Sequence, residues 1–215
     1  EKFERVPAIE LGLSSDTFLA DTISELETKT FLTNSDAHSL PKIAREYNKI
    51  LVNDISFKEL MMAIKNEGGR KIIANYGLDP KLGKYHRTYC EKCDKRIEGE
   101  APVLHCPDCD SSNITMGVFD RIEVIKDKKE TKSPDFRPPY IYQIPLTFIP
   151  GVGPKVIEKL LGNFETEMNV LHKLSRDDIE GVVGAKVANA ISNACSGNVN
   201  IQAGGGGVYG KISVG

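Results

Sequence analysis

The sequence predicts an α+β protein of several domains: a partial α/β segment, a small metal-binding module and a helical domain. Three observations support this division. Apolar runs alternate with helical patterns up to residue 69, paired cysteines follow within residues 70–126, and the pattern from residue 149 to 215 is mostly helical. With 215 residues and 40% apolar content, the chain is long enough for one or two ordinary hydrophobic cores.

The segment 1–69 alternates strand-like and helical patterns. Strands are expected over residues 8–13, 30–32 and 50–52, and helices over residues 16–26, 41–47 and 56–68. Ser56 and Glu59 predict a capping box for the last helix. Alternating βα units imply a parallel sheet, and such a sheet needs both faces covered. Because three strands are too few, we expect this segment to be the last part of a larger α/β domain.

Four cysteines form two C-x2-C motifs that are separated by twelve residues. Paired motifs of this kind can hold one Zn²⁺ through four thiolates, which leaves no coordination position for a substrate, so the zinc would be structural. Turn formers such as Asp94 and Asp110 follow each motif. Core packing of free thiols and a pair of disulfides are the alternatives. The predicted zinc ligands are Cys90, Cys93, Cys106 and Cys109.

The regions around the cysteine motifs predict less regular structure. Residues 70–84 form a looser stretch, and residues 115–125 predict a strand with charged and apolar side chains interleaved. Residues 127–148 predict a linker, which begins in a charge run and continues into proline-rich sequence. Prolines there exclude a long helix and favour extended backbone.

The helical segment 149–215 opens with the turn Pro150 to Lys155, which resembles the hairpin of helix-hairpin-helix DNA-binding domains. Glycines in such a hairpin let backbone N–H groups approach a DNA phosphate, and the N-terminus of the next helix adds a favourable dipole. A second, degenerate copy spans residues 182–186. The alternative is a packing corner with glycine caps. The predicted DNA-binding residues are Gly151, Val152, Gly153, Lys155 and Lys186.

Asp36 and His38 form an Asp-x-His pair directly after the predicted strand 30–32. The carboxyl ends of parallel strands are where α/β barrels place catalytic groups. The pair alone is a weak signal, since a carboxylate that caps a turn beside a surface histidine would give the same pattern.

Several separate segments together resemble endonuclease Q, a family of metal-dependent DNA repair enzymes built on a PHP (polymerase and histidinol phosphatase) domain. These segments are residues 9–16, 35–38, 83–86 with the cysteine motifs, 137–140 and 203–210. The resemblance implies that segment 1–69 is the carboxyl-terminal part of a PHP barrel and that residues 70–126 form a zinc-ribbon-like module. It also implies that Asp36 and His38 are catalytic ligands in a cluster of divalent ions (Zn²⁺, Mg²⁺ or Mn²⁺). The other ligands of such a cluster would precede Glu1, so we expect this chain to be inactive alone.

The resemblance further implies an enzyme that nicks double-stranded DNA on the 5′ side of deaminated bases such as uracil and hypoxanthine. Ser14, Ser15 and Asp16, on the loop after the first strand, would then contact a base edge, although a helix N-cap explains the same residues. Two other functions stay open: a non-enzymatic zinc and helix-hairpin-helix nucleic-acid-binding module, and a PHP phosphoesterase that acts on small metabolites. The glycine run 204–207 would approach a phosphate or pack against the helical domain.

Charge and hydropathy limit the partners of this protein. A net charge of −2 offers no general electrostatic attraction for nucleic acid, so DNA binding must be local. No apolar run is long enough to span a bilayer and no basic-then-apolar leader opens the chain, so no membrane partner is expected. Thiolate ligands persist in a reducing compartment, which predicts a cytoplasmic location. A sliding clamp is a candidate further partner about which the sequence is silent.

Overall fold

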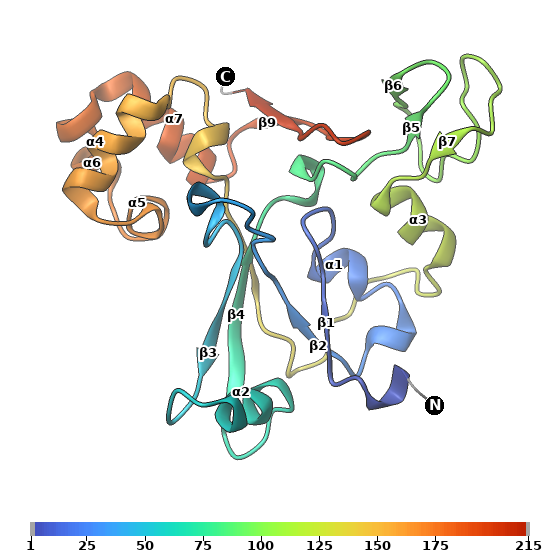
Figure 1. Ribbon diagram of the computed structural model, residues 1–215, viewed down its shortest axis with the longest axis horizontal. Helices are drawn as coiled ribbons and strands as arrows, with labels where there is room; N and C mark the ends of the chain where they lie inside the picture. The colour runs from blue at the N-terminus through green and yellow to red at the C-terminus, as the bar shows by residue number, and fades with distance from the viewer. Residues whose placement is uncertain (1–2, 214–215) are drawn as a thin grey trace. The chain divides into compact units, whose positions relative to one another are not determined.

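The computed structural model describes residues 3–213, which divide into two compact units (Figure 1). Unit 1 contains the chain up to Tyr142 together with Ala203–Tyr209. Unit 2 contains Gln143–Gln202 and the residues from Gly210 onward. The protein is a mixed α+β structure with several small sheets, which agrees with the predicted class. No helix in the described part of the chain is both long and apolar enough to cross a bilayer.

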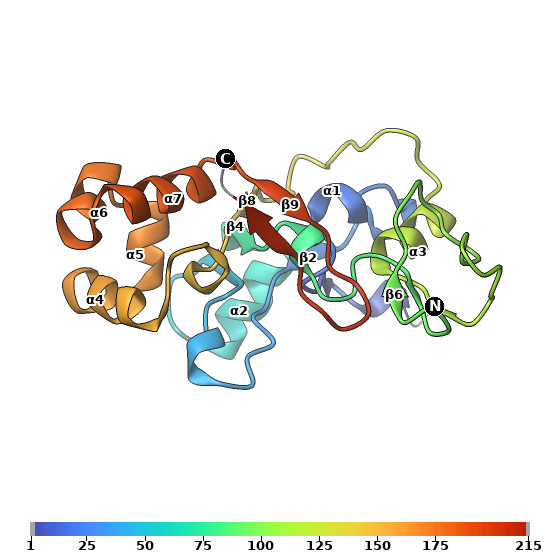
Figure 2. The ribbon, with the colours of Figure 1, turned by 90° about the horizontal axis from the view of Figure 1, so that it is seen from above.

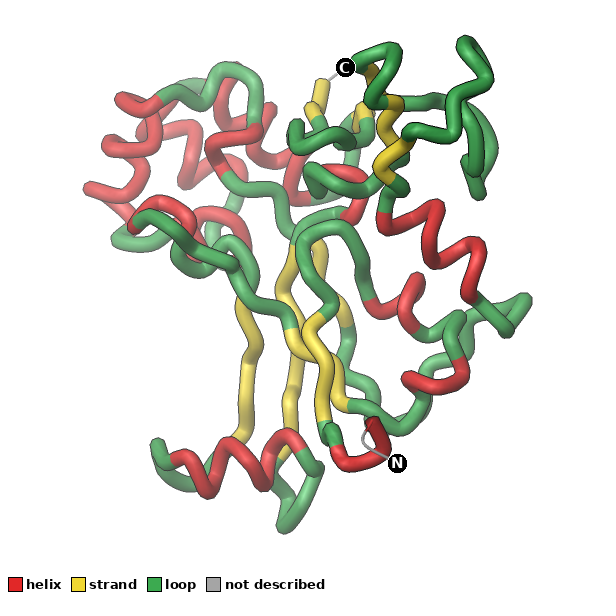
Figure 3. The backbone as a smooth tube through the Cα atoms, turned by 45° about the vertical axis from the view of Figure 1, so that its right-hand side comes forward, coloured by secondary structure: helices red, strands yellow, loops and turns green. Residues whose placement is uncertain are grey.

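Two sheets form the centre of unit 1. In the first sheet, β1 (Ala8–Glu10) pairs in parallel with β2 (Thr30–Leu32). In the second, β4 (Lys71–Gly77) lies between antiparallel β3 (Tyr47–Leu51) and parallel β8 (Tyr140–Tyr142). Figure 3 shows β3 and β4 as a long strand pair.

Short helices connect the strands of unit 1. The α-helices are α1 (Thr17–Ala20), α2 (Phe57–Ile64) and α3 (Val118–Ile125). The 3₁₀ turns are η1 (Phe3–Arg5), η2 (Ser24–Leu26), η3 (Leu40–Lys42) and η4 (Pro80–Leu82). Ser56 caps α2 as predicted, because its hydroxyl accepts a hydrogen bond from the Glu59 N–H. The Glu59 carboxylate instead accepts from the Asn53 N–H, so only half of the predicted capping box forms.

Several predicted elements are wrong. Residues 41–47 give one 3₁₀ turn and the start of β3 rather than a helix. The strand predicted at residues 50–52 lies partly in β3, which pairs antiparallel with β4 instead of joining a parallel sheet. The stretch predicted to be loose contains β4, the longest strand of unit 1. Tertiary burial explains β4, since its side chains at Ile72 and Ala74 lie in the core although polar residues interrupt the apolar pattern.

Residues 115–125 form helix α3 for most of their length, where a strand was expected. Charged residues interleaved with apolar ones are typical of the polar face of a strand. Asp120, however, is fully buried and Ile122 is nearly so, which places a carboxylate within the buried face of a helix. A charged residue on the buried face interrupts the helical spacing of the apolar residues. That spacing alone therefore does not identify residues 118–125 as a helix.

The cysteine module, residues 89–115, is a small three-stranded antiparallel sheet with two loops. β5 (Tyr89–Cys90) pairs with β6 (Lys95–Arg96) on one side and with β7 (Ile114–Thr115) on the other. Four buried side chains form its core, and two of them are cysteines: Cys90, Ile97, Val103 and Cys106. The module therefore has little apolar material of its own.

Unit 2 is mostly helical. Its helices α4 (Pro154–Phe164), α5 (Glu167–His172), α6 (Arg176–Val183) and α7 (Ala185–Cys195) gather in one bundle, which Figure 2 shows from above. The 3₁₀ turn η5 (Leu146–Phe148) precedes them, and β9 (Asn200–Gln202) pairs antiparallel with β10 (Lys211–Ser213). The buried side chains of the bundle include Leu160, Val170, Ile179, Ala188 and Ile191.

Candidate metal centre and nucleic-acid-binding elements

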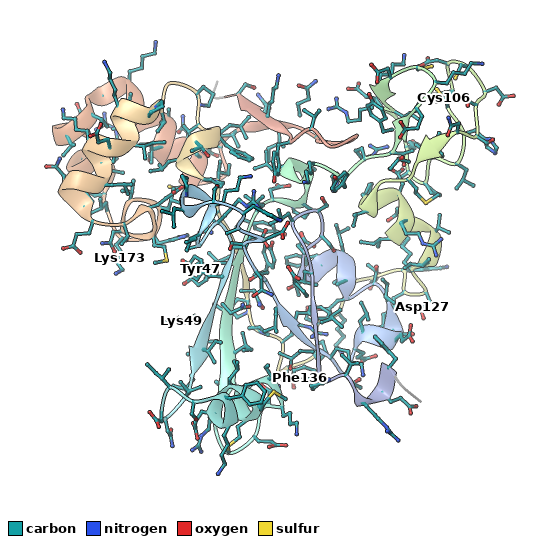
Figure 4. The ribbon with its side chains drawn as sticks, in the orientation of Figure 1. Tyr47, Lys49, Cys106, Asp127, Phe136 and Lys173 are labelled. Carbon is teal, nitrogen blue, oxygen red and sulfur yellow. The ribbon has the colours of Figure 1, made fainter. Side chains whose placement is uncertain are left out.

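The four cysteine sulfurs of the module converge on one point. All four Sγ atoms lie within 4.8 Å of one another, with 3.7 Å between Cys90 and Cys109 and 3.8 Å between Cys93 and Cys106. Four sulfurs at the usual Zn–S distance of about 2.3 Å form a tetrahedron with edges of about 3.8 Å. The donor set and its spacing therefore fit one tetrahedral Zn²⁺. Figure 4 labels Cys106 within this module.

The two C-x2-C loops have the same backbone turn. Asp94 follows Cys93 and Asp110 follows Cys109, and both have a φ of 53°, in the left-handed region that aspartate tolerates better than most side chains. Hydrogen bonding to Cys109 is the largest effect that raises the pKa of Cys93, to about 12. Four such crowded sulfurs cannot all be thiolates without a neighbouring cation, which is the charge that Zn²⁺ supplies.

Asp120 of α3 fixes the module to the rest of unit 1. Its carboxylate is fully buried, and it accepts hydrogen bonds from the N–H groups of Val103 at 2.9 Å and Thr88 at 3.0 Å. The Arg87 Nε donates to the same carboxylate at 3.2 Å. Sequence reasoning missed this residue because its partners are 17 to 33 positions away.

The predicted catalytic pair, Asp36 and His38, lies on the loop that follows β2. Both side chains are exposed, and the Asp36 Oδ1 and the His38 Nδ1 are 3.9 Å apart. The His38 Nδ1 lies 2.9 Å from the Asp36 carbonyl oxygen. A hydrogen bond there leaves Nε2 as the ligating atom, which is how second partners usually orient metal-bound histidines. The pair therefore suits a divalent ion chemically.

Asp36 and His38 do not form a complete metal site among the described residues. The cysteine cluster is the only group of three or more histidine, cysteine, aspartate or glutamate ligands that residues 3–213 bring together. A pair of ligands alone cannot hold a catalytic ion firmly. Their catalytic role remains a prediction.

The three residues predicted to contact a base are buried, and the side chains of two of them already form hydrogen bonds within the protein. Asp16 caps α1, since its Oδ1 accepts from the Leu19 N–H at 2.8 Å, and its Oδ2 accepts from the Tyr142 hydroxyl at 2.7 Å. The Ser14 hydroxyl accepts from the Tyr85 N–H at 3.4 Å, and Ser15 is 6% exposed. The predicted N-cap at Asp16 is confirmed, while contact of these residues with a base stays a prediction.

Glu46 is a buried carboxyl that sequence reasoning missed. Its Oε1 accepts from the Leu78 N–H at 2.8 Å, directly after β4, and its Oε2 is buried with no hydrogen-bond partner. Burial is the largest effect that raises the pKa of Glu46 to about 8. The residue fell within a predicted helix, so no local signal marked it as buried.

We expect Glu46→Gln to stabilise the protein in alkaline solution. The pKa of Glu46 in the folded state exceeds its ordinary value of 4.5, so the folded state binds a proton that the unfolded state releases between pH 4.5 and 8. Native stability therefore falls across this window, and glutamine, which mimics the protonated acid, avoids the loss. The expected gain is about 2–4 kcal/mol at pH 9 and little at pH 4.

Urea unfolding at pH 4 and pH 9 measures this effect, with tyrosine fluorescence as the signal. All seven tyrosines lie in unit 1, and the chain has no tryptophan. The exposed Glu100→Gln is the matched control and should change neither midpoint. Equal gains for Glu46→Gln at both pH values would contradict a raised pKa.

The first glycine turn, residues 150–155, has the backbone of an anion-binding turn. Gly151 has a φ of 87°, a conformation that disfavours other residues, and Gly153 is the N-cap of α4. Within the described chain, the N–H groups of Gly151, Gly153 and Lys155 have no acceptor. Val152 instead points into the core of unit 2, where it is 6% exposed. Its predicted contact with DNA is therefore limited to its backbone.

The second glycine turn, residues 182–186, lies beside the first. Gly184 has a φ of 84° and precedes α7, and Lys186 is exposed in the first turn of that helix. A groove of about 670 Å³ joins the two turns; it is lined by Pro150, Gly151, Lys186, Val187, Asn189, Ala190 and Asn193. The structure thus brings Gly151 and Lys186 together, although 35 positions separate them in the sequence.

Comparison with solved structures identifies a relative for almost the whole chain. The crystal structure of the lesion-specific endonuclease PfuEndoQ from Pyrococcus furiosus matches 98% of this chain with 36% identity and a TM-score of 0.80. A structure of endonuclease Q in complex with a 27-mer duplex that has an abasic lesion at the active site matches 98% of the chain, with 36% identity and a TM-score of 0.84. The chain is a partial homologue of endonuclease Q.

This homologue of endonuclease Q spans only part of its relatives. It covers 55% and 56% of the two solved chains. It is also 50% identical to the uncharacterized protein YqxK of Bacillus subtilis (strain 168), of which it covers 52%. The uncharacterized protein MJ0043 of Methanocaldococcus jannaschii is 42% identical and is covered over 28% of its length. No family model matches the chain.

Proposed function

We propose that this chain is part of an endonuclease that nicks double-stranded DNA beside a damaged base. One observation carries the proposal: the likeness to a lesion-specific endonuclease extends over 98% of the chain at 36% identity. A relative bound to a duplex with an abasic lesion at its active site supports DNA as the substrate. We further propose incision on the 5′ side of deaminated bases such as uracil and hypoxanthine, and no activity of this chain alone.

Each part of the chain has a distinct role in this proposal. The cysteine module holds structural Zn²⁺, and the two glycine turns act as a helix-hairpin-helix element that binds DNA phosphates through backbone N–H groups and two lysines. Asp36 and His38 contribute two ligands to a divalent ion site that other parts of a PHP domain complete. Such ions supply an activated water and stabilise phosphate charge.

The loop Ser14–Asp16 follows β1 and would face a damaged base. The side chains of Ser14 and Asp16 already have partners, so recognition of a base edge would use the loop backbone and the Ser15 hydroxyl. Taking a base out of the stack costs least where pairing is already weakened, which favours mismatched or damaged bases as substrates.

The decisive test is incision by the whole polypeptide that contains this chain. It is incubated with Mg²⁺ or Mn²⁺ and a duplex that carries one uracil or one inosine. We expect a nick 5′ to the lesion, and a loss of at least about 100-fold in Asp36→Ala because a metal ligand is removed. The matched control is Asp135→Ala, an exposed aspartate on another loop of unit 1. Absence of incision, or full incision by Asp36→Ala, would refute the proposal.

The second candidate is a binding module without enzymatic activity, which the two glycine turns favour. Fluorescence anisotropy of a labelled duplex tests the binding itself: affinity should fall with salt and should weaken in Lys155→Glu. Lys173→Glu, on the exposed end of α5, is the control (Figure 4). Binding without incision by the whole polypeptide would favour this candidate. Cleavage of small phosphate esters without DNA binding would favour a phosphoesterase.

A further inference from the structure

The glycine-rich strap, residues 203–209, packs into unit 1 rather than into the helical unit. The Gly204 N–H donates to the Lys81 carbonyl at 2.7 Å, and the Arg87 N–H donates to the Gly204 carbonyl at 3.0 Å. The Gly207 N–H donates to the Lys84 carbonyl at 3.0 Å. The strap therefore runs along residues 81–87 as a hydrogen-bonded segment of unit 1. Of the two alternatives that the sequence leaves open for the glycine run, these contacts do not support packing against the helical domain.

Close packing explains why the strap contains glycines. A Cβ at Gly206 would overlap the ring of Tyr89, and a Cβ at Gly205 would lie 2.7 Å from the Arg87 carbonyl oxygen. Arg96 of β6 donates a hydrogen bond to the Ala203 carbonyl. Tyr89 and Arg96 both belong to the cysteine module, so the module holds one end of the strap in place.

The other end of the strap reaches the loop that contains Asp36. The Arg45 Nη1 donates to the Tyr209 hydroxyl at 2.8 Å, and its Nη2 donates to the Ser35 carbonyl at 2.7 Å. The guanidinium carbon is 5.5 Å from the centre of the Tyr209 ring. Arg45 is only 8% exposed, so its planar fork is held between the strap and the residue that precedes Asp36.

The hydrogen bond from Arg45 to the Ser35 carbonyl holds the backbone directly before the predicted metal ligands. Thr33 is fully buried and tied to β3, because its hydroxyl donates to the Tyr47 carbonyl at 2.9 Å. After Ser35 the chain enters the left-handed region at Asp36, with a φ of 45°. The side chains of Asp36 and His38 then project into solvent. The position of both therefore depends on the carbonyl that Arg45 holds.

We propose that Arg45 and Tyr209 are positioning residues that hold Asp36 and His38 ready to bind a divalent ion. The inference rests on the proposed function, in which these two residues are metal ligands. Arg45 acts through the Ser35 carbonyl, and Tyr209 acts by fixing the guanidinium. A preorganised pair loses less conformational entropy when the ion binds, which tightens binding without a new contact to the metal.

The first test reads the loop directly and needs no activity. Tyr209→Phe keeps the ring and removes the hydroxyl that accepts from Arg45. In this chain, NMR order parameters of the amides of residues 36–38 should fall from about 0.85, typical of rigid backbone, to below about 0.6. The matched control is Tyr85→Phe, since the Tyr85 hydroxyl has no hydrogen-bond partner among the described residues. Unchanged order parameters in Tyr209→Phe, or an equal fall in Tyr85→Phe, would overturn the inference.

The second test separates positioning from general damage. In the whole polypeptide, Tyr209→Phe should raise the Mn²⁺ concentration for half-maximal incision by about 10-fold, with the rate restored at saturating Mn²⁺ and the KM for duplex unchanged. A lower rate at saturating Mn²⁺ with an unchanged metal requirement would overturn it. Failure of the proposed function looks different, because Asp36→Ala would then incise normally whatever the state of the loop.

Discussion

Removal of zinc should unfold the cysteine module while the long strands of unit 1 persist. The module has three strands of two residues each, and two of its four core side chains are cysteines. Such a core cannot offset the conformational entropy of about 27 ordered residues, at about 1–2 kcal/mol each for the backbone. Structural zinc contributes about 10–16 kcal/mol in small peptides at neutral pH, which is enough to decide whether the module folds.

Metal analysis and NMR together measure this effect. We expect one zinc per chain, and its loss on chelation or in Cys106→Ser should collapse the amide dispersion of residues 89–115. The β3–β4 signals should remain, because that sheet has its own contacts. Cys195→Ser is the matched control, since Cys195 lies in α7 of unit 2 and outside the cluster. Unchanged module signals after the metal is removed would contradict a structural role for zinc.

Features with local signals could be predicted from the sequence. The cysteine cluster follows from spacing within 20 residues, and the caps at Ser56 and Asp16 follow from a side chain three residues before its backbone partner. The glycine turn at Gly151 is local in the same sense, because its positive φ depends on one residue. Such features are set by neighbours in the chain, so they survive in any tertiary context.

Features that depend on distant partners could not be predicted. The strand predicted over residues 115–125 is mostly helix α3, whose Asp120 is buried by backbone groups elsewhere in unit 1. The sequence leaves the contacts of the strap open, and the structure pairs its Tyr209 with Arg45, which lies 164 positions away. Glu46 carries no local sign of burial, since the Leu78 N–H that it binds lies on another strand end.

Arg137 is a further residue whose partner is distant in the sequence. It lies in the segment that was predicted as a proline-rich linker, yet its side chain is 1% exposed and pairs with Asp21, which is equally buried. The Nη2 donates to the Asp21 Oδ1 at 2.7 Å, and the guanidinium carbon is 3.4 Å from the centre of the Phe31 ring. Arg137 also donates to the Lys29 carbonyl. This buried pair fastens residues 134–140 to the β1–β2 region and so places β8 beside β4.

We expect Asp21→Ala to destabilise unit 1 by about 3–5 kcal/mol, because it leaves a buried guanidinium without its counter-charge. Burial already lowers the pKa of Arg137, yet an arginine does not lose its proton at neutral pH, so the charge must stay or the segment must detach. Urea unfolding followed by tyrosine fluorescence reports unit 1 alone.

The matched control for Asp21→Ala is Glu27→Ala, which removes the half-exposed ion pair with Lys128 at 3.2 Å. A pair at the surface is worth at most about 1 kcal/mol, so the two losses should differ severalfold. Replacing both members, as Asp21→Leu with Arg137→Met, should recover much of the stability, since the cost of Asp21→Ala lies in the unpaired charge rather than in a missing contact. If Asp21→Ala costs no more than Glu27→Ala, then the pair does not anchor the segment, and β8 must be held by its ladder to β4 and by its own side-chain hydrogen bonds, such as that from Tyr142 to Asp16.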